Sequence, residues 1–338
     1  MAGSTATAAS NIDLTGHHVR GHRGETVKFK NPYPSYGPSF NIFQMISRIL
    51  RARLLGKLSQ PDSTNVKLPV FPASFLPSRN GTGTLRATWL GHACYYVEFP
   101  TGLRVLFDPV FEDRCMPVQW MGHKRYTRPP CSLSDLPFVD SVVISHSHYD
   151  HLSYQSVLEI KHRHPGAHYF VGLGLAQWFR KCGISNVTEM DWWQDADLVL
   201  AVSTSDSMAS SVSKTSSSIS ARFSCLPSQH SSGRTPNDRD ATLWASWAVS
   251  SGDKSVWFAG DTGYRAVPEL PPDVDDYGPE YESLPRCPHF AQIGNLRGPF
   301  DLGLIPIGAY KPRFLWSPLH ANPYDASNGY TLGNLGPH

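Results

Sequence analysis

The stretch that decides the fold covers residues 142–152 and reads VVISHSHYDHL. Three apolar residues come first, and His146, His148, Asp150 and His151 follow within six residues. The chain leaves the sheet at the end of a buried strand, so these side chains can converge on one point. Neutral imidazoles and carboxylates are good zinc ligands. We therefore expect a metal site in which His146 and His148 bind one ion and Asp150 and His151 can bind a second.

Two more polar residues end apolar stretches in the same way. His230 follows ARFSCLPSQ, and Asp261 follows SVWFAG. Taken alone, His230 would be an ordinary core or surface histidine and Asp261 the aspartate of a turn before glycine. As members of a series of strand-end groups they become candidate ligands, and Asp261 could bridge two zinc ions roughly 3.5–4 Å apart.

Composition excludes several classes of protein. The 338 residues carry 30 basic and 28 acidic side chains, a net charge of +2, which is too balanced for a nucleic-acid-binding surface. No apolar stretch reaches the roughly 18 residues of a membrane-spanning helix, and the N-terminus lacks the apolar core of a secretory signal. Its Ser/Thr/Ala-rich start allows a mitochondrial transit peptide. We expect an intracellular protein, cytoplasmic or membrane-associated, that is not secreted.

The six cysteines are scattered and form no CxxC pair. In a chain of this length without a secretory signal we expect them to be reduced thiols, which disfavours a cysteine zinc site. Two residues near the predicted strands are less telling. Asp108 before Pro109 is expected to form a strand-end turn that supports the site, and His92 has either a structural or a catalytic role.

We divide the chain into an N-terminal extension (1–83), partly disordered, and a domain (84–338). The extension contains a basic amphipathic helix near 41–58, which either packs on the domain or lies on an anionic membrane surface. Its apolar residues fall at helical spacing between basic ones: Ile42, Met45, Ile46, Ile49, Leu50 and Leu54, with Arg48, Arg51, Arg53 and Lys57.

Within the domain the pattern predicts strands at 85–99, 103–111, 139–145, 199–202, 221–226, 242–249, 255–259 and 302–307. A helix is expected over 153–164, with Ser153 as its N-cap. The Ser-rich segment 203–220 and the Pro-rich segment 268–288 are interpreted as insertions. The last residues, ASNGYTLGNLGPH, show no helix or strand signal.

The motifs together resemble the N-acylphosphatidylethanolamine-hydrolysing phospholipase D family of the metallo-β-lactamase fold superfamily. The resemblance covers residues 29–325 and rests on FKNPYPSY (29–36), TWLGHA (88–93), DPVF (108–111), VISHSHYDHL (143–152), DWW (191–193), PSQH (227–230), FAGDTGY (258–264) and GPFDLGLIPIGAYKPR (298–313). It implies an α/β fold, a metallo-β-lactamase-like four-layer αββα sandwich with two zinc ions at one edge.

The resemblance also implies roles for single residues. The first zinc would be held by His146, His148 and His230, and the second by Asp150 and His151. Asp261 would bridge the two ions. His320 matches an active-site histidine near the substrate, so Asp150 and His320 are the candidate catalytic residues.

One part of the family pattern has no match in this sequence. The family's second zinc takes a further histidine from a late strand, in a His-Trp-Gly-Thr-like motif that this chain lacks. We therefore expect the last helix and strand of the fold to be absent and the second zinc site to be weaker, so that near one Zn²⁺ binds per chain when metal is limiting. That expectation puts the activity in doubt.

The resemblance implies a zinc-dependent phosphodiesterase that hydrolyses N-acylphosphatidylethanolamine to N-acylethanolamine and phosphatidic acid. Its substrate is a membrane phospholipid, so the protein would contact the bilayer peripherally through the basic helix. A homodimer is compatible with this interpretation. Two alternatives stay open: a hydrolase of another ester, lactone or phosphodiester on the same fold, and an inactive remnant that binds zinc or lipid.

Overall fold

Two β-sheets face each other in the computed structural model, which describes residues 16–38, 42–57, 68–79, 83–116, 118–122, 124–201, 218–271 and 274–332. The first sheet has the order β3 (Arg86–Gly91), β4 (Cys94–Glu98), β5 (Arg104–Phe107), β6 (Ser141–Val143), β7 (His168–Gly172) and β8 (Val187–Met190). The second has the order β13 (Leu302–Leu304), β12 (Lys254–Phe258), β11 (Ser246–Ser251), β10 (Ser218–Leu226) and β9 (Asp195–Ala201). β1 (His18–Arg20) and β2 (Thr26–Phe29) form a third, two-stranded sheet, the N-terminal hairpin.

The sheets meet through a shared apolar core. Exposed and buried residues alternate along the first half of β10, and from Phe223 to Leu226 every residue is buried. The rings of Phe223 and Phe170 stack with their centres 3.8 Å apart, one from each sheet. The same core contains Phe107 and Val143 from the first sheet and residues of β11 and β12 from the second.

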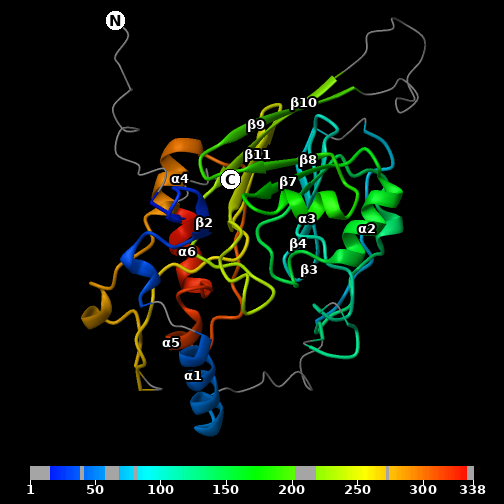
Figure 1. The fold of residues 1–338 in the computed structure, drawn as a ribbon. Helices are drawn as coiled ribbons and strands as arrows, with labels where there is room; N and C mark the ends of the chain where they lie inside the picture. The colour runs from blue at the N-terminus through cyan, green and yellow to red at the C-terminus, as the bar shows by residue number, and fades with distance from the viewer. Residues whose placement is uncertain are drawn as a thin grey trace, which may run out of the picture.

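Helices cover the two outer faces (Figure 1). On the first sheet lie α2 (Tyr154–Arg163) and α3 (Ala176–Lys181), which bury Val157 and Phe179 against it. On the second sheet lies α4 (His289–Arg297), whose Phe290 packs on Trp257, with α6 (Pro323–Leu332) against α4. The layers therefore run helix, sheet, sheet, helix. The predicted cap is confirmed, since the Ser153 side chain accepts a hydrogen bond from the backbone at the start of α2.

The strand directions bring the ends of four strands to one edge. Strands β5 and β6 are parallel neighbours, with Phe107 opposite Val143. Both β10 and β12 pair antiparallel with β11, so they run in the same direction as each other. The segments that follow these four strands carry Asp108, the histidine-rich stretch, His230 and Asp261.

Several predicted elements differ from the observed ones. The strand expected at 242–249 begins only at Ser246, and those expected at 302–307 and 139–145 shorten to three residues each. Strands β7 and β8 were not predicted. Of the segment interpreted as an insertion at 203–220, residues 203–217 lie outside the described residues, and 218–220 belong to β10, because β9 provides a paired strand there.

The prediction that the tail has no helix is wrong, because α6 begins at Pro323. Asn322 and Asp325 cap it reciprocally: Asp325 N donates to Asn322 Oδ1 at 2.7 Å, and Asn322 N donates to Asp325 Oδ2 at 3.3 Å. Proline at the first helical position fits the same pattern. Gly329 then packs closely on the Phe290 ring. No strand follows β13 within the part of the chain that the structure describes.

Residues 16–38 pack on the domain. Phe29 is a member of the core between the sheets, and Ser35 donates to Gln229 at 2.6 Å. The Pro-rich segment is anchored as well, since Asp276 accepts hydrogen bonds from Arg313 at 2.9 and 3.0 Å. The sequence boundary at 83/84 therefore does not separate two structural units.

Helix α1 (Ile42–Leu54) confirms the helix predicted near 41–58 and projects at the bottom of Figure 1 beside α5 (Arg313–Trp316). Its contact with the domain is made by Ala52, which is buried, and by Arg48 over the Phe314 ring. Apolar side chains instead form an exposed stripe, which we call the α1 stripe: Phe43, Ile46, Leu50 and Leu54. None of the helices in the described ranges is long and apolar enough to cross a membrane.

Candidate metal centre

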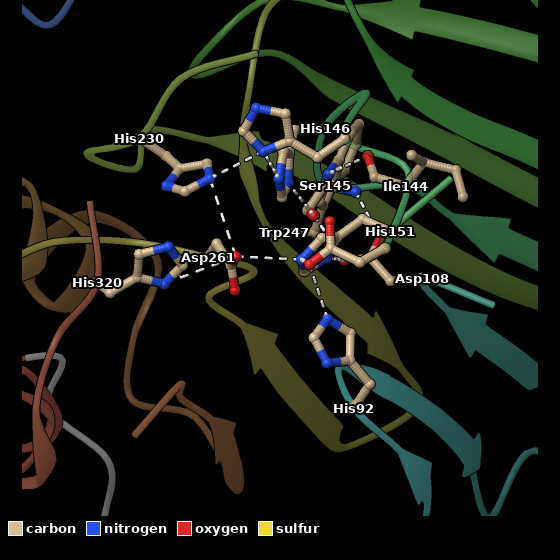
Figure 2. A network of polar contacts seen from close by, with 12 residues as sticks. His92, Asp108, Ile144, Ser145, His146, His151, His230, Trp247, Asp261 and His320 are labelled. Atoms are coloured by element: carbon tan, nitrogen blue, oxygen red, sulfur yellow. Dashed lines mark hydrogen bonds and ion pairs between the residues drawn. The ribbon is translucent and has the colours of Figure 1, made fainter. Parts of the chain in front are cut away.

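Three imidazoles from two distant parts of the chain converge at the edge where the strands end (Figure 2). His146 Nε2 lies 2.8 Å from His148 Nδ1, and His230 Nε2 lies 3.3 Å from the same atom. His146 and His230 are each 1% exposed. Three ring nitrogens that face one another in a buried place form a donor set for a single cation.

The far nitrogens of two of these rings are held by the protein. His230 Nδ1 donates to the Leu319 carbonyl at 2.9 Å. Ser145 Oγ donates to Asp108 at 2.5 Å, so His146 Nδ1 is the donor in its 2.8 Å contact with Ser145. With the proton fixed on Nδ1 of His146 and His230, each Nε2 keeps a free lone pair. This arrangement is the one in which metal-ligating histidines are usually oriented.

A second group of residues lies beside the first. His151 Nδ1 donates to the Asp108 carboxylate at 2.7 Å, and His151 Nε2 lies 3.1 Å from Asp261 Oδ2 and 3.7 Å from Asp150 Oδ2. Asp150 also accepts a hydrogen bond from His92 at 3.1 Å. The group is more open than the first, because the side chains of Asp150 and His92 are 36% and 44% exposed.

Asp261 stands between the two groups. Its Oδ2 lies 3.1 Å from His151 Nε2 and 3.9 Å from His230 Nε2. The same oxygen lies 3.8 Å from His320 Nδ1, and His320 and Asp261 each leave 15% of the side chain exposed. The structure thus brings the six candidate ligands and His320 together at one place. Asp108, predicted to support the site, holds His151 and Ser145.

Two glycines of the FAGDTGY stretch (258–264) allow neighbouring loops to approach Asp261 closely. A Cβ on Gly260, whose φ is +59°, would lie 2.6 Å from Ser145 Cβ. A Cβ on Gly263 would lie 2.1 Å from the Pro318 carbonyl oxygen. The end of β12 can therefore approach the histidine loop on one side and the loop that carries His320 on the other. A larger residue at either position would push Asp261 out of place.

Burial and mutual repulsion set the charge of the first group. Burial, with the neighbouring imidazoles, holds the pKa of His146 well below its ordinary value, and burial does the same for the pKa of His230. Both rings therefore stay neutral, the state in which imidazole binds a metal. Burial opposes ionisation of Asp261, but the His151 and His320 rings outweigh it and hold the pKa of Asp261 well below its usual range.

The second group favours a positive charge. Burial disfavours the charged form of His151, but Asp261, Asp150 and Asp108 outweigh it and raise the pKa of His151 well above its ordinary value. Three carboxylates thus surround a place that stabilises a cation. A divalent ion would supply that charge, and donors of imidazole nitrogen and carboxylate oxygen fit zinc and other first-row metals.

Arg234 was missed by the sequence analysis. Its Nε donates to the Ser147 carbonyl at 2.6 Å and its Nη2 to the Leu152 carbonyl, so one guanidinium ties both ends of the histidine loop. The same group lies over the Tyr149 and Trp178 rings at 4.7 and 5.2 Å. The two hydrogen bonds join residues more than 80 positions apart, so no local pattern could reveal them.

A second missed contact comes from the N-terminal segment. Asn31 donates to the His230 carbonyl at 2.7 Å, across 199 positions of sequence. The FKNPYPSY stretch that contains Asn31 carried no chemical signal of its own. Through Asn31 it holds the backbone of the loop after β10 at His230.

A family model described as "Beta-lactamase superfamily domain" matches residues 103–330, which contain all six candidate ligands and His320. The chain belongs to the beta-lactamase superfamily. The resemblance to this superfamily noted from the sequence is therefore confirmed, and the matched region contains the His/Asp clusters that could hold metal ions.

Among the relatives of this beta-lactamase superfamily chain are two named phospholipases. An N-acyl-phosphatidylethanolamine-hydrolyzing phospholipase D 1 from Caenorhabditis elegans is 37% identical over 73% of the chain and 60% of its own length. The mitochondrial N-acyl-phosphatidylethanolamine-hydrolyzing phospholipase D of Saccharomyces cerevisiae is 30% identical over 70% of the chain and 43% of its own. An uncharacterized protein of Mycobacterium tuberculosis is 36% identical over 73% of the chain and 55% of its own. The matched region thus spans about half the length of these relatives.

Proposed function

We propose that this chain is a zinc-dependent phosphodiesterase that hydrolyses N-acylphosphatidylethanolamine to N-acylethanolamine and phosphatidic acid. The observation that carries the proposal is the convergence of His146, His148 and His230 beside Asp261, in a chain 37% and 30% identical to two phospholipases named for this substrate.

In this proposal His146, His148 and His230 would hold one zinc ion, Asp150 and His151 a second, and Asp261 both. Bound zinc would lower the pKa of a coordinated water to about 7 and neutralise charge on the phosphate oxygens. The chain's own contribution is to keep the donors in place, through Asp108 on His151 and the Leu319 carbonyl on His230.

We assign the two catalytic roles to His320 and Asp150, whose side chains are partly exposed. His320, whose Nδ1 lies 3.8 Å from Asp261 Oδ2 and whose side chain is 15% exposed, would hold a proton for the departing oxygen of the N-acylethanolamine. Asp150 is exposed enough to meet the incoming water and is kept ionised, since His151 and His92 outweigh burial and lower its pKa.

The proposed substrate lies in a bilayer, and the α1 stripe offers a means of contact. Leu54 is 87% exposed and Phe43 80%, and Arg51 and Arg53 sit in the last turn of the same helix. An apolar stripe with adjacent basic residues is typical of helices that lie in the headgroup region of anionic membranes. Leu54→Glu should therefore reduce sedimentation with phosphatidylserine vesicles several-fold, whereas Val199→Glu, a change at an exposed apolar residue of β9, should not.

The alternative occupant of the α1 stripe is a second copy of the chain. In that case light scattering would give twice the chain mass without lipid, and Leu54→Glu would halve it while leaving vesicle binding unchanged.

The function itself is tested with purified protein, N-acylphosphatidylethanolamine in mixed micelles and water enriched in ¹⁸O. The expected products are N-acylethanolamine without label and phosphatidic acid with one ¹⁸O, formed only after zinc is added back to metal-stripped protein. Absence of both products while zinc is bound would contradict the proposal and favour a different substrate or an inactive chain.

A further inference from the structure

A second cluster of metal-binding side chains lies where the N-terminal hairpin meets the turn between β8 and β9. His17 Nε2 lies 2.7 Å from Asp191 Oδ1, and His18 Nε2 lies 2.8 Å from Asp191 Oδ2. Each of the three residues offers one potential ligand atom, and these three atoms lie within 4.8 Å of one another. The cluster shares no residue with the centre at the strand ends.

The rings are held in the orientation that metal binding needs. His18 Nδ1 contacts Thr26 Oγ1 at 2.8 Å, which leaves Nε2 to face the carboxylate. The His17 ring stacks on Trp192, with the centres 4.1 Å apart. A hydrogen-bonded second ring nitrogen, as on His18, is usual for histidines that bind metals, and the stacking contact fixes the position of the His17 ring.

The carboxylate is fixed as well. Asp191 Oδ1 accepts a hydrogen bond from Trp192 N at 2.8 Å, and Trp192 is buried in the core between the sheets. The side chains of His17 and His18 are 2% and 7% exposed, whereas that of Asp191 is 19% exposed. Two buried imidazoles and one partly open carboxylate leave a side from which an ion and a water could enter.

We propose that His17, His18 and Asp191 form a structural binding site for a divalent metal ion of the zinc type, which pins the N-terminal hairpin to the β8–β9 turn. Two imidazole nitrogens and a carboxylate are ligands that zinc prefers, with water completing the set. The ion would join segments 173 and 174 positions apart, so it would stabilise the folded chain through mass action.

The test must separate a metal site from a clasp held by hydrogen bonds alone. His18→Gln does so, because the glutamine amide can still donate to Asp191 but is a poor zinc ligand. His22→Gln, at an exposed histidine between β1 and β2, is the matched control. Each protein is stripped of metal, equilibrated with Zn²⁺ and measured for zinc per chain and for the shift of its thermal midpoint on adding Zn²⁺.

The proposal expects His18→Gln to lose one zinc per chain and at least part of the zinc-induced rise in the midpoint, with His22→Gln equal to wild type. Equal zinc content in all three proteins would overturn it. If His18→Gln does not fold, the wild-type protein is crystallised with Zn²⁺ and a zinc anomalous-scattering map is recorded. A peak between His17, His18 and Asp191 would support the site, and the absence of a peak there would overturn it. Lipid hydrolysis is not measured, so failure here would leave the proposed function standing.

Discussion

The candidate metal centre has a buried half, formed by His146, His148 and His230, and an open half, formed by Asp150 and His151. The two halves differ in how tightly the protein holds their side chains in place. His146 and His230 are buried, and each has its second ring nitrogen fixed by a partner. Asp150 is 36% exposed, and its partner His92 is 44% exposed. On the proposed function, the buried half would therefore bind its ion more tightly, and substrate and water would meet the centre at the open half.

The largest effect is expected in the buried half. His148→Ala removes the ring whose Nδ1 faces both other imidazoles. Loss of an outer partner alone weakens metal sites about 10- to 100-fold, so this change should lower metal affinity and hydrolysis by at least about 100-fold. The measurement is a chelator competition together with the lipid assay, and His162→Ala, at an exposed histidine of α2, is the control. Unchanged metal content in His148→Ala would contradict the assignment.

A change at Arg234 tests whether the loop that carries His146 and His148 must be clamped for the buried half to bind a metal ion tightly. Arg234→Met removes both hydrogen bonds to the loop carbonyls and should weaken metal binding about 10-fold or more, as outer partners do. The matched control is Arg222→Met on β10, since Arg222 pairs with Asp197 in solvent. Equal metal affinity of the two variants would show that the loop is rigid without the clamp.

His92 tests the open half. His92→Ala deprives Asp150 of its hydrogen bond and leaves His146, His148 and His230 untouched. We expect hydrolysis to fall about 10-fold while the more tightly bound metal ion is retained, because an outer partner of one half is lost. A loss of all bound metal in this variant would break the distinction between the halves.

His289 is a buried histidine that belongs to neither half of the metal centre. We expect the smallest of the four effects here, a change in how the free energy of unfolding depends on pH. Burial lowers the pKa of His289 to about 3, so the folded state keeps it neutral while the unfolded state binds a proton below about pH 6.5. Stability from this residue is present above that pH and is lost as the pH falls toward 3. The free energy of unfolding should drop by about 1 kcal/mol between pH 7.5 and 5.5 on this account.

Urea unfolding at the two pH values checks this, with His289→Gln as the comparison. The variant should show a weaker dependence on pH, since it has no imidazole to protonate. An identical dependence in both proteins would mean that His289 is not neutral in the folded state.

The convergence of the candidate ligands could be predicted from the sequence, because each of them lies shortly after a predicted strand. The histidine-rich stretch follows a strand, and His230 and Asp261 each follow an apolar stretch, so topology alone brings them to one edge. The sequence could not predict Arg234 or Asn31, whose contacts span between 82 and 199 positions and depend on the packing of loops. The capping pair Asn322 and Asp325 was readable in the sequence, but the glycine and asparagines around it obscured the helix.

The metal centre is tested most directly by an anomalous-scattering map, recorded at the zinc absorption edge, of crystals grown with Zn²⁺. We expect the strongest peak among His146 Nε2, His148 Nδ1 and His230 Nε2, and a weaker one between His151, Asp150 and Asp261. A map with no peak within bonding distance of the three imidazoles, from protein that carries zinc elsewhere, would contradict this expectation.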